Sequence, residues 1–208
     1  MKLAIFSHCA IDTITVNGMT HEQIGGAACY GGITARQLKF DVDLHTRFGK
    51  DFPKQYLTQN KINFENALSE KLTTRFAIDI TGSDRTLKMI NECDPIEYTS
   101  INADGSLVTP IFHEISFDTL DKIKKDSSFT LVDPQGFLRR VDSDKNVILE
   151  TTELDLTGVD AIKVNPEESQ RIVNGSYDEM MMALQKKGVK YVVFTNKTEV
   201  SLLVKDKI

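Results

Sequence analysis

The apolar positions of the chain fall into two patterns, and the first is a set of short continuous apolar runs. Such runs are typical of strands that are buried on both faces of a parallel sheet. They alternate with stretches whose apolar residues recur at helical spacing. Strands of this kind are expected at residues 3–6, 129–132, 161–164 and 191–194, an alternating strand is expected at 41–47, and helices are expected at 27–38, 51–57, 116–125, 166–173 and 177–187. This pattern predicts an α/β fold with a doubly wound, mostly parallel sheet and helices on both faces.

The second pattern is an alternation of apolar and polar residues in two predicted hairpins. One hairpin occupies residues 12–24 with a turn at Asn17-Gly18, and the other occupies 73–91 with a turn at 81–84. An alternating strand buries one face, so its other face should be solvated or should face a ligand. Because both hairpins interrupt the order of strands and helices, they are expected to form one small β lid over a single α/β domain spanning residues 1–208.

Composition and charge narrow the classes of function. The chain has 208 residues, 40% hydrophobic and 26% charged, as in a globular domain with one core. No apolar run approaches the roughly 18 residues of a membrane span, and residues 1–8 lack signal-peptide features, so a cytoplasmic protein without a membrane partner is expected. The formal charge is −5 and basic residues are scattered, which argues against a nucleic-acid partner. Three cysteines and four histidines show no metal-site spacing.

Two candidate ligand-binding features lie near the first predicted strand. Asp12 follows its carboxyl end, where open α/β sheets bind ligands, and a carboxylate there could accept hydrogen bonds from two hydroxyls of a polyol. Capping a turn is the alternative role for Asp12. Gly25 and Gly26 precede a predicted helix, where they would let a ligand approach the backbone and the helix amides. A glycine turn with close helix packing is about as well supported by the residues alone.

Two further candidates follow later predicted strands. Asp133 and Arg139 could face a substrate, or they could pair with each other and hold their loop. Asn165 and Glu168 have the spacing of a helix capping box, and Pro166 suits the first helical position. The functional alternative is that Asn165 and Glu168 organise water and Mg²⁺ beside the phosphates of a nucleotide.

The order of these motifs along the chain resembles that of the ribokinase-like (PfkB) carbohydrate and nucleoside kinase family. Each motif alone is weak, but their order and spacing are fairly specific and extend through the whole chain. The series is Asp12, Gly25-Gly26, Phe48-Gly49-Lys50-Asp51-Phe52, the second lid hairpin, Asp133-Pro134 and Asn165-x-x-Glu168. The resemblance implies a ribokinase-like fold and ATP-dependent, Mg²⁺-assisted phosphorylation of a hydroxyl on a small sugar, cyclitol or nucleoside.

The resemblance also implies a role for each matching residue. The acceptor would be bound by Asp12, Gly25, Gly26, Tyr30, Asp133 and Arg139. The donor would be bound by Asn165 and Thr195, and Mg²⁺ would be supported by Glu168. Tyr30 stands where many members carry an asparagine that contacts the sugar, which shifts the expected acceptor away from ribose.

Two departures from the family pattern concern phosphoryl transfer. Members often have a Thr-x-Gly-x-x-Gly turn after the strand expected at 191–194, but residues 195–200 lack both glycines. The family's Gly-Ala-Gly-Asp motif, which supplies the catalytic base and an anion hole, would lie beyond residue 208, and no Gly-x-Gly-Asp occurs within the chain. A 208-residue protein is therefore expected to show little or no kinase turnover, because base catalysis contributes roughly 10²–10⁴-fold.

Two alternatives to a kinase stay open. A non-catalytic polyol- or nucleoside-binding protein would keep Asp12 and the glycine pocket without the phosphoryl-transfer half. A nicotinamide-dependent oxidoreductase is disfavoured because its glycine fingerprint is missing.

A homodimer through the lid strands is also expected, because the family fold often dimerises there. Apolar lid residues would supply the interface, and the alternative is that these residues simply cover the substrate. They are Phe76, Ile78, Ile80, Leu87 and Met89.

Overall fold

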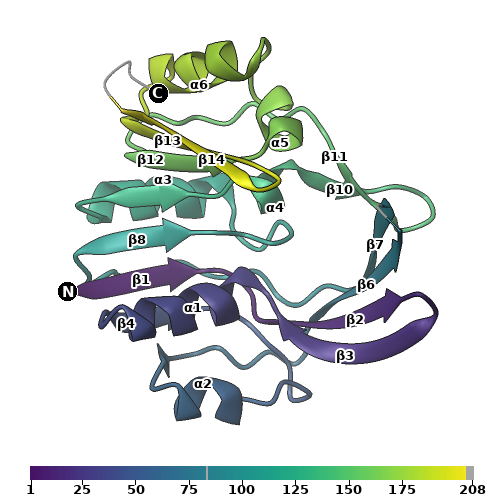
Figure 1. The fold of residues 1–208 in the computed structure, drawn as a ribbon. Coiled ribbons are helices and arrows are strands. Elements are labelled where there is room, and N and C mark those ends of the chain that lie inside the picture. The colour runs from purple at the N-terminus through teal and green to yellow at the C-terminus, as the bar shows by residue number, and fades with distance from the viewer. Residues whose placement is uncertain (83, 205–208) are drawn as a thin grey trace.

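The computed structural model describes residues 1–82 and 84–204, and its centre is one eight-stranded sheet (Figure 1). The order across the sheet is β14-β13-β12-β9-β8-β1-β4-β5. Neighbouring strands run parallel except at one edge, where β14 pairs antiparallel with β13. The strands are β1 (Lys2–Phe6), β4 (Asp41–His45), β5 (Asn63–Phe64), β8 (Gly105–Val108), β9 (Thr130–Val132), β12 (Ala161–Val164), β13 (Tyr191–Asn196) and β14 (Glu199–Val204).

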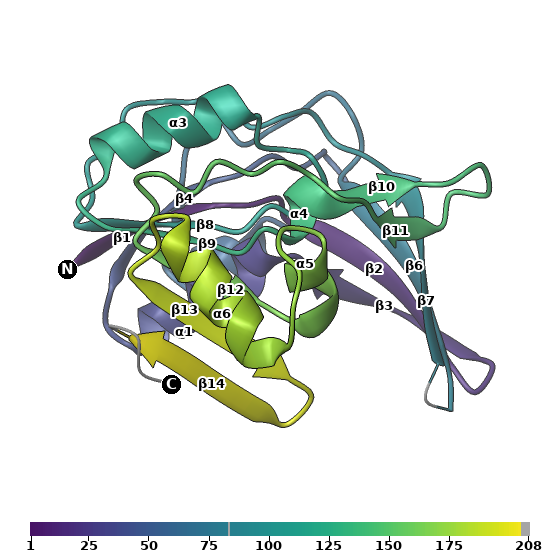
Figure 2. The same cartoon turned by 90° about the horizontal axis from the view of Figure 1, so that it is seen from above.

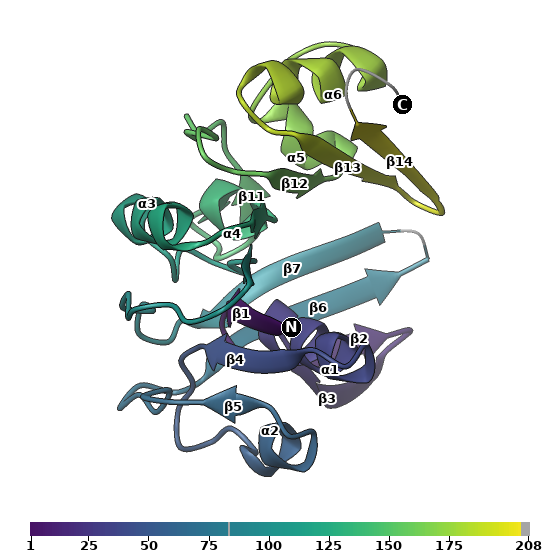
Figure 3. The same cartoon turned by 90° about the vertical axis from the view of Figure 1, so that its left-hand side faces the viewer.

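Helices cover both faces of this sheet, which confirms the predicted doubly wound α/β fold. Helix α1 (Ala27–Gln37) packs on one face against β1 and β4, and α3 (Phe117–Asp126) lies on the opposite face (Figure 3). Alternate residues of β1 serve the two sides: Ala4 and Phe6 join the core under α3, and Ile5 joins the core under α1. The other helices are α2 (Gln55–Gln59), α4 (Gln135–Leu138), α5 (Pro166–Gln170) and α6 (Tyr177–Lys186). Within the described residues, no helix is long and apolar enough to cross a membrane.

Most continuous apolar runs form central strands as predicted, but three strands of the sheet were not predicted. They are β5, β8 and β14, which are short or polar in sequence. β8, for example, is only Gly-Ser-Leu-Val, and it becomes a strand because β1 and β9 pair with its two edges. Two helices are also shorter than expected, since α2 begins at Gln55 and α5 ends at Gln170.

The two predicted hairpins combine into a four-stranded lid at the carboxyl ends of the central strands (Figure 2). The order is β3-β2-β6-β7, with β2 and β6 parallel and the outer pairs antiparallel. The lid strands are β2 (Ala10–Val16), β3 (Met19–Gly25), β6 (Thr74–Thr81) and β7 (Asp84–Asn91). A separate two-stranded ribbon, β10 (Arg139–Val141) and β11 (Val147–Leu149), touches β7 through a bridge between Lys88 and Asn146.

The apolar face of the lid turns toward the sheet rather than toward solvent. Phe76, Ile78 and Met89 are buried and form one cluster with Ile111 and Phe112 of the loop after β8. This packing supports the alternative interpretation, in which the apolar lid residues cover a ligand. A homodimer through the lid stays a prediction.

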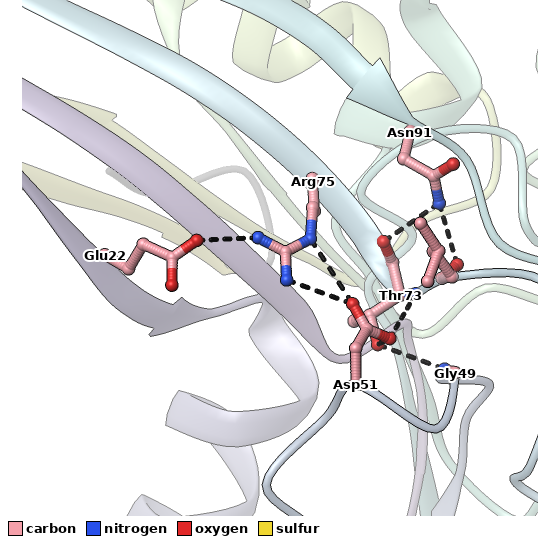
Figure 4. Close-up of polar contacts among 7 residues, drawn as sticks. Glu22, Gly49, Asp51, Thr73, Arg75 and Asn91 are labelled. Atoms are coloured by element: carbon pink, nitrogen blue, oxygen red, sulfur yellow. Dashed lines mark hydrogen bonds and ion pairs between the residues drawn. The ribbon is translucent and has the colours of Figure 1, made fainter.

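A polar network fastens the base of the lid to the α/β core (Figure 4). The Oδ1 of Asp51 accepts hydrogen bonds from the backbone N–H of Thr73 at 3.0 Å and from its hydroxyl at 2.7 Å. The guanidinium of Arg75 donates to Asp51 Oδ2 at 3.0 Å and to Glu22 Oε1 at 2.8 Å. The backbone N–H of Gly49 donates to the Thr73 hydroxyl at 3.0 Å. The glycine motif at residues 48–52 therefore attaches the lid.

This network should make the stability of the protein sensitive to acid through Asp51. Burial alone would raise the pKa of Asp51, but hydrogen bonds from Thr73 and Arg75 lower it below the ordinary value of 3.8. A lowered folded-state pKa contributes stability that is present above the unfolded pKa and is lost as pH falls through the folded one. We expect Asp51→Asn to lower the free energy of unfolding at pH 7, and we expect this loss to shrink below about pH 4.

Urea unfolding of the two proteins at pH 7 and pH 3 measures this difference. Asp144→Asn, in an exposed turn, is the control and should change the unfolding free energy little at either pH. A loss in Asp51→Asn that is equal at the two pH values would contradict the role given to the carboxylate.

Candidate functional site

A cavity of about 240 Å³ lies between the lid and the carboxyl edge of the central sheet. Its apolar wall comes from the lid and its other walls carry polar and charged groups. The lining residues are Ala10, Asp12, Gly26, Ala27, Tyr30, Phe76, Ile78, Arg85, Leu87, Ile111, Gln135 and Arg139. Four of the predicted acceptor residues, Asp12, Gly26, Tyr30 and Arg139, are therefore brought together here. Arg85 and Gln135 are lining residues that the sequence reasoning did not single out.

Asp12 carries the most informative group of the cavity. It lies within β2, so it caps no turn. Its Oδ1 is buried and has no hydrogen-bond partner among the described residues. Burial raises the pKa of the Asp12 carboxyl, and the positive charges of Arg85 and Arg139, together with a contact between the carboxyl and the backbone of Phe76, oppose that rise. Because buried polar atoms are nearly always hydrogen-bonded, this oxygen is a natural acceptor for a ligand hydroxyl.

Gly25 and Gly26 are required by close packing beside that carboxylate. A Cβ on Gly25 would overlap Oδ2 of Asp12, and a Cβ on Gly26 would overlap the backbone oxygen of His8. Gly26 also has a φ of 89°, in the left-handed region that favours glycine. As the N-cap of α1 it sets the start of this helix against the cavity. The structure is therefore consistent with both roles considered for the glycine pair: the glycines allow close packing of the helix, and they leave the start of the helix open to the cavity.

Gly18 is a control that separates two costs of replacing Gly26: the cost of its positive φ, and the cost of placing a Cβ against the backbone of His8. Gly18 has a similar φ of 80°, but no atom lies within 4 Å of its would-be Cβ. We expect Gly18→Ala to cost about 1 kcal/mol of unfolding free energy, for the conformation alone. Gly26→Ala should cost roughly 1–3 kcal/mol more, because the helix must move off the backbone of His8. Equal losses in urea unfolding would contradict the packing argument.

Tyr30 is held in place by the lid. Its hydroxyl donates to the backbone oxygen of Ile24 at 2.9 Å and accepts from Nε2 of Gln23 at 2.7 Å. Both partners belong to β3, so the ring forms a wall fixed between α1 and the lid. The ring is the bulky group that stands where a sugar-contacting asparagine was expected from the family pattern.

Glu114 is a structural residue of the site that the sequence reasoning missed. Its side chain is buried, and its carboxylate accepts from the backbone N–H groups of His8 at 2.9 Å, Ile111 at 2.7 Å and Phe112 at 2.6 Å. These amides belong to the loops that follow β1 and β8. Nothing in the local sequence signals this role, because the amides come from segments more than 100 residues apart.

A second charged cluster adjoins the cavity at the carboxyl ends of β9 and β12. Nζ of Lys163 lies 3.1 Å from Oδ2 of Asp133 and 3.8 Å from Oε2 of Glu168. Glu168 and Asn165 form the predicted capping box, with both hydrogen bonds at 2.9 Å. Lys163 was missed in the sequence, although a lysine inside an otherwise apolar strand was a usable signal.

Arg139 does not pair with Asp133, contrary to one of the two interpretations of that segment. Its guanidinium donates to the backbone oxygen of Ile111 at 2.9 Å and lies 5.6 Å from the ring centre of Phe76. Burial lowers the pKa of Arg139 to about 10, although Glu168 opposes this shift. Burial likewise raises the pKa of Glu168; Asp133 adds to the rise and Lys163 opposes it.

The Mg²⁺ implied by the family resemblance does not fit this cluster as a directly coordinated ion. Among the described residues, no group of three or more His, Cys, Asp or Glu side chains could hold a metal. The ammonium of Lys163 already lies between the carboxylates of Asp133 and Glu168. Thr195 lies apart from the cavity lining, and its hydroxyl donates to the backbone oxygen of Val164 at 3.4 Å.

Removing the ammonium of Lys163 should expose the repulsion between its two carboxylate neighbours. We expect Lys163→Met to lower the free energy of unfolding at pH 7 by roughly 1–3 kcal/mol, less than for a fully buried pair because the Lys163 side chain is 32% exposed. The double variant Lys163→Met/Glu168→Gln should recover part of this loss in urea unfolding. If the loss of unfolding free energy in the double variant equals the sum of the losses in the two single variants, the electrostatic coupling between Lys163 and Glu168 is contradicted.

No family model and no curated protein matches the sequence, but many solved structures match the fold. A sulfate complex of a pyrophosphate-dependent kinase in the ribokinase family has a TM-score of 0.87 at 19% identity, over 98% of this chain and 76% of that one. A pyrophosphate-dependent kinase of this family, complexed with a pyrophosphate analogue and myo-inositol, scores 0.84 at 18% identity with the same coverage. Arabidopsis thaliana ribokinase, complexed with ribose and ATP, scores 0.72 at 13% identity, over 100% and 76%.

These matches establish the class of fold. The chain has the ribokinase-like fold, and the three solved structures described above are kinases of the ribokinase family. The resemblance seen in the order of sequence motifs is thereby confirmed for the fold.

Proposed function

We propose that this chain is a small-molecule kinase that directs a phosphoryl group to a hydroxyl of a sugar or cyclitol, with a nucleoside as a less favoured acceptor. The observation that carries the proposal is the buried Asp12 oxygen, which no described protein group satisfies. The cavity of about 240 Å³ is smaller than the roughly 300–1,000 Å³ of pockets for drug-sized ligands, which suits a single small ring. Proteins of this fold have been seen with myo-inositol and with ribose.

The acceptor half of the mechanism follows from the lining of the cavity. Asp12 accepts hydrogen bonds from acceptor hydroxyls and so fixes the ring against the start of α1. Phe76, Ile78 and Leu87 cover the ring from the lid and exclude water. Orientation and exclusion of water are the contributions that a phosphoryl-transfer enzyme draws mainly from its scaffold.

The donor half would lie beside the positive group next to the cavity. Lys163 supplies positive charge at the carboxyl edge of the sheet, where it would stabilise phosphate oxygens. ATP is the donor that the family resemblance implies. Removal of the proton from the acceptor hydroxyl is assigned to no residue, because residues 1–208 contain no Gly-x-Gly-Asp.

A specific observation favours a second candidate, a polyol-binding protein without phosphoryl transfer. Residues 195–200 form the closed end of the β13–β14 hairpin, where Thr195 pairs with Val200 and Asn196 with Glu199. Lys197 and Val200 stand where the family's glycines would be. A hairpin end paired in this way has fewer free amides with which to hold a phosphate.

Replacing Asp12 tests the acceptor site in either case. We expect Asp12→Asn to weaken binding of myo-inositol or ribose roughly 10–100-fold in calorimetric titration, because hydrogen bonds to a charged acceptor contribute about 1.5–3 kcal/mol. Asp79→Asn is the control, since Asp79 is exposed on the same lid. Unchanged affinity in Asp12→Asn would remove the basis of the proposal.

Release of ADP from ATP, or of phosphate from pyrophosphate, measured with each acceptor that binds, separates the two candidates. Acceptor-dependent release identifies a kinase, and binding without release identifies a binding protein. If sugars, cyclitols and nucleosides all fail to bind, both candidates are wrong.

A further inference from the structure

Among the described residues, two guanidinium groups and one carboxylate line the cavity. Arg139 enters from the start of β10 and Arg85 from β7 of the lid, and both line the cavity together with Asp12. Among the described residues, the arginines in ion pairs with carboxylates within 4.0 Å are Arg36, Arg75 and Arg140, so neither cavity arginine has such a pair.

Among the described residues, no carboxylate forms an ion pair with either cavity arginine. Arg139 is largely buried, and burial lowers its pKa to about 10. The carboxylates of Glu168, Asp133 and Glu114, which form no ion pair with it, oppose this shift, and Arg85 adds to it. Among the described lining residues, only Asp12 carries a carboxylate, and burial raises the pKa of that group. Burying the Arg139 guanidinium without an ion-pair partner is unfavourable, and the exposed Arg85 lines the same cavity, so the cavity is suited to a ligand that brings negative charge.

The two arginines reach the cavity from different elements. Arg85 shares a face of β7 with Leu87, and both side chains line the cavity from the lid. Arg139, at the start of β10, donates to the backbone oxygen of Ile111 and lies 5.6 Å from the ring centre of the lid residue Phe76. An anion bound by both guanidinium groups would therefore link β7 to the segment that begins β10.

We propose that the acceptor is an anionic polyol, whose carboxylate or phosphate group is held by Arg85 and Arg139 while Asp12 accepts from its hydroxyls. This inference rests on the proposed function and specifies the class of its substrate. Guanidinium groups match the planar or trigonal arrangement of oxygen atoms in both anions and bind them with paired hydrogen bonds. A neutral polyol would leave two cationic side chains facing one carboxylate.

Binding of three ring compounds tests the inference without requiring turnover. The probes are myo-inositol, which is neutral, glucuronate, which carries a carboxylate, and myo-inositol 1-phosphate. Calorimetric titration should show at least one anionic probe binding roughly tenfold or more tightly than myo-inositol at 50 mM salt, with a smaller advantage at 300 mM. The anion with the larger advantage identifies whether a carboxylate or a phosphate is recognised.

Arg85→Gln should remove most of this advantage and leave the affinity for myo-inositol within about twofold. Lys88→Gln is the matched control. It removes one positive charge from the same strand, but Lys88 lies on the outer face of the lid beside Thr15 and Asp79. Thermal unfolding of both variants checks that the lid remains folded, which is expected because both side chains are exposed.

Three outcomes would overturn the inference. Anionic probes that bind no more tightly than myo-inositol would leave the proposed function standing and show that the acceptor is neutral. If Lys88→Gln reduces the affinity advantage of the anionic probe as much as Arg85→Gln does, the anion is attracted by the overall positive charge of the lid and not by Arg85 in particular. If none of the three compounds binds but another neutral sugar or a nucleoside does, the inference fails and the proposed function stands.

Discussion

The carboxylate of Glu114 joins the loops that leave the carboxyl ends of β1 and β8, and the cavity floor depends on it. It accepts three backbone amides, one from His8 and two from Ile111 and Phe112. Charge-assisted hydrogen bonds in a buried site are strong and directional, so these loops are held in one arrangement. The loop after β1 leads directly into β2 and places Asp12. The loop after β8 supplies Ile111, whose backbone oxygen holds Arg139.

The lid uses apolar side chains to cover the cavity and polar side chains to attach itself to the core. Its apolar side chains Phe76 and Ile78 complete the core beneath it and cover the acceptor position. Its attachment is polar and concentrated at one point, where Asp51 holds Thr73 and Arg75.

The sequence was sufficient for the fold class because its signals were local and repeated. Continuous apolar runs are found only where both faces of a strand are covered, so the central strands could be predicted from them. The same reasoning missed β8 and the edge strand β14. Their sequences are short or partly polar, and they become strands through pairing with neighbours. The Asn165–Glu168 capping box was predictable because all of its contacts lie within four residues.

The sequence by itself determined most of the central strands and helices, the capping box and the position of Asp12, Gly25 and Gly26 near a strand end. Only the tertiary structure showed that Asp12 and Arg139 line one cavity and that Lys163 lies near two carboxylates. It also showed that the Glu114 carboxylate accepts hydrogen bonds from three backbone N–H groups. The physical reason is distance along the chain. Secondary structure depends on periodicity within about ten residues, whereas the charge balance of the cavity depends on groups that only the parallel sheet and its lid bring together.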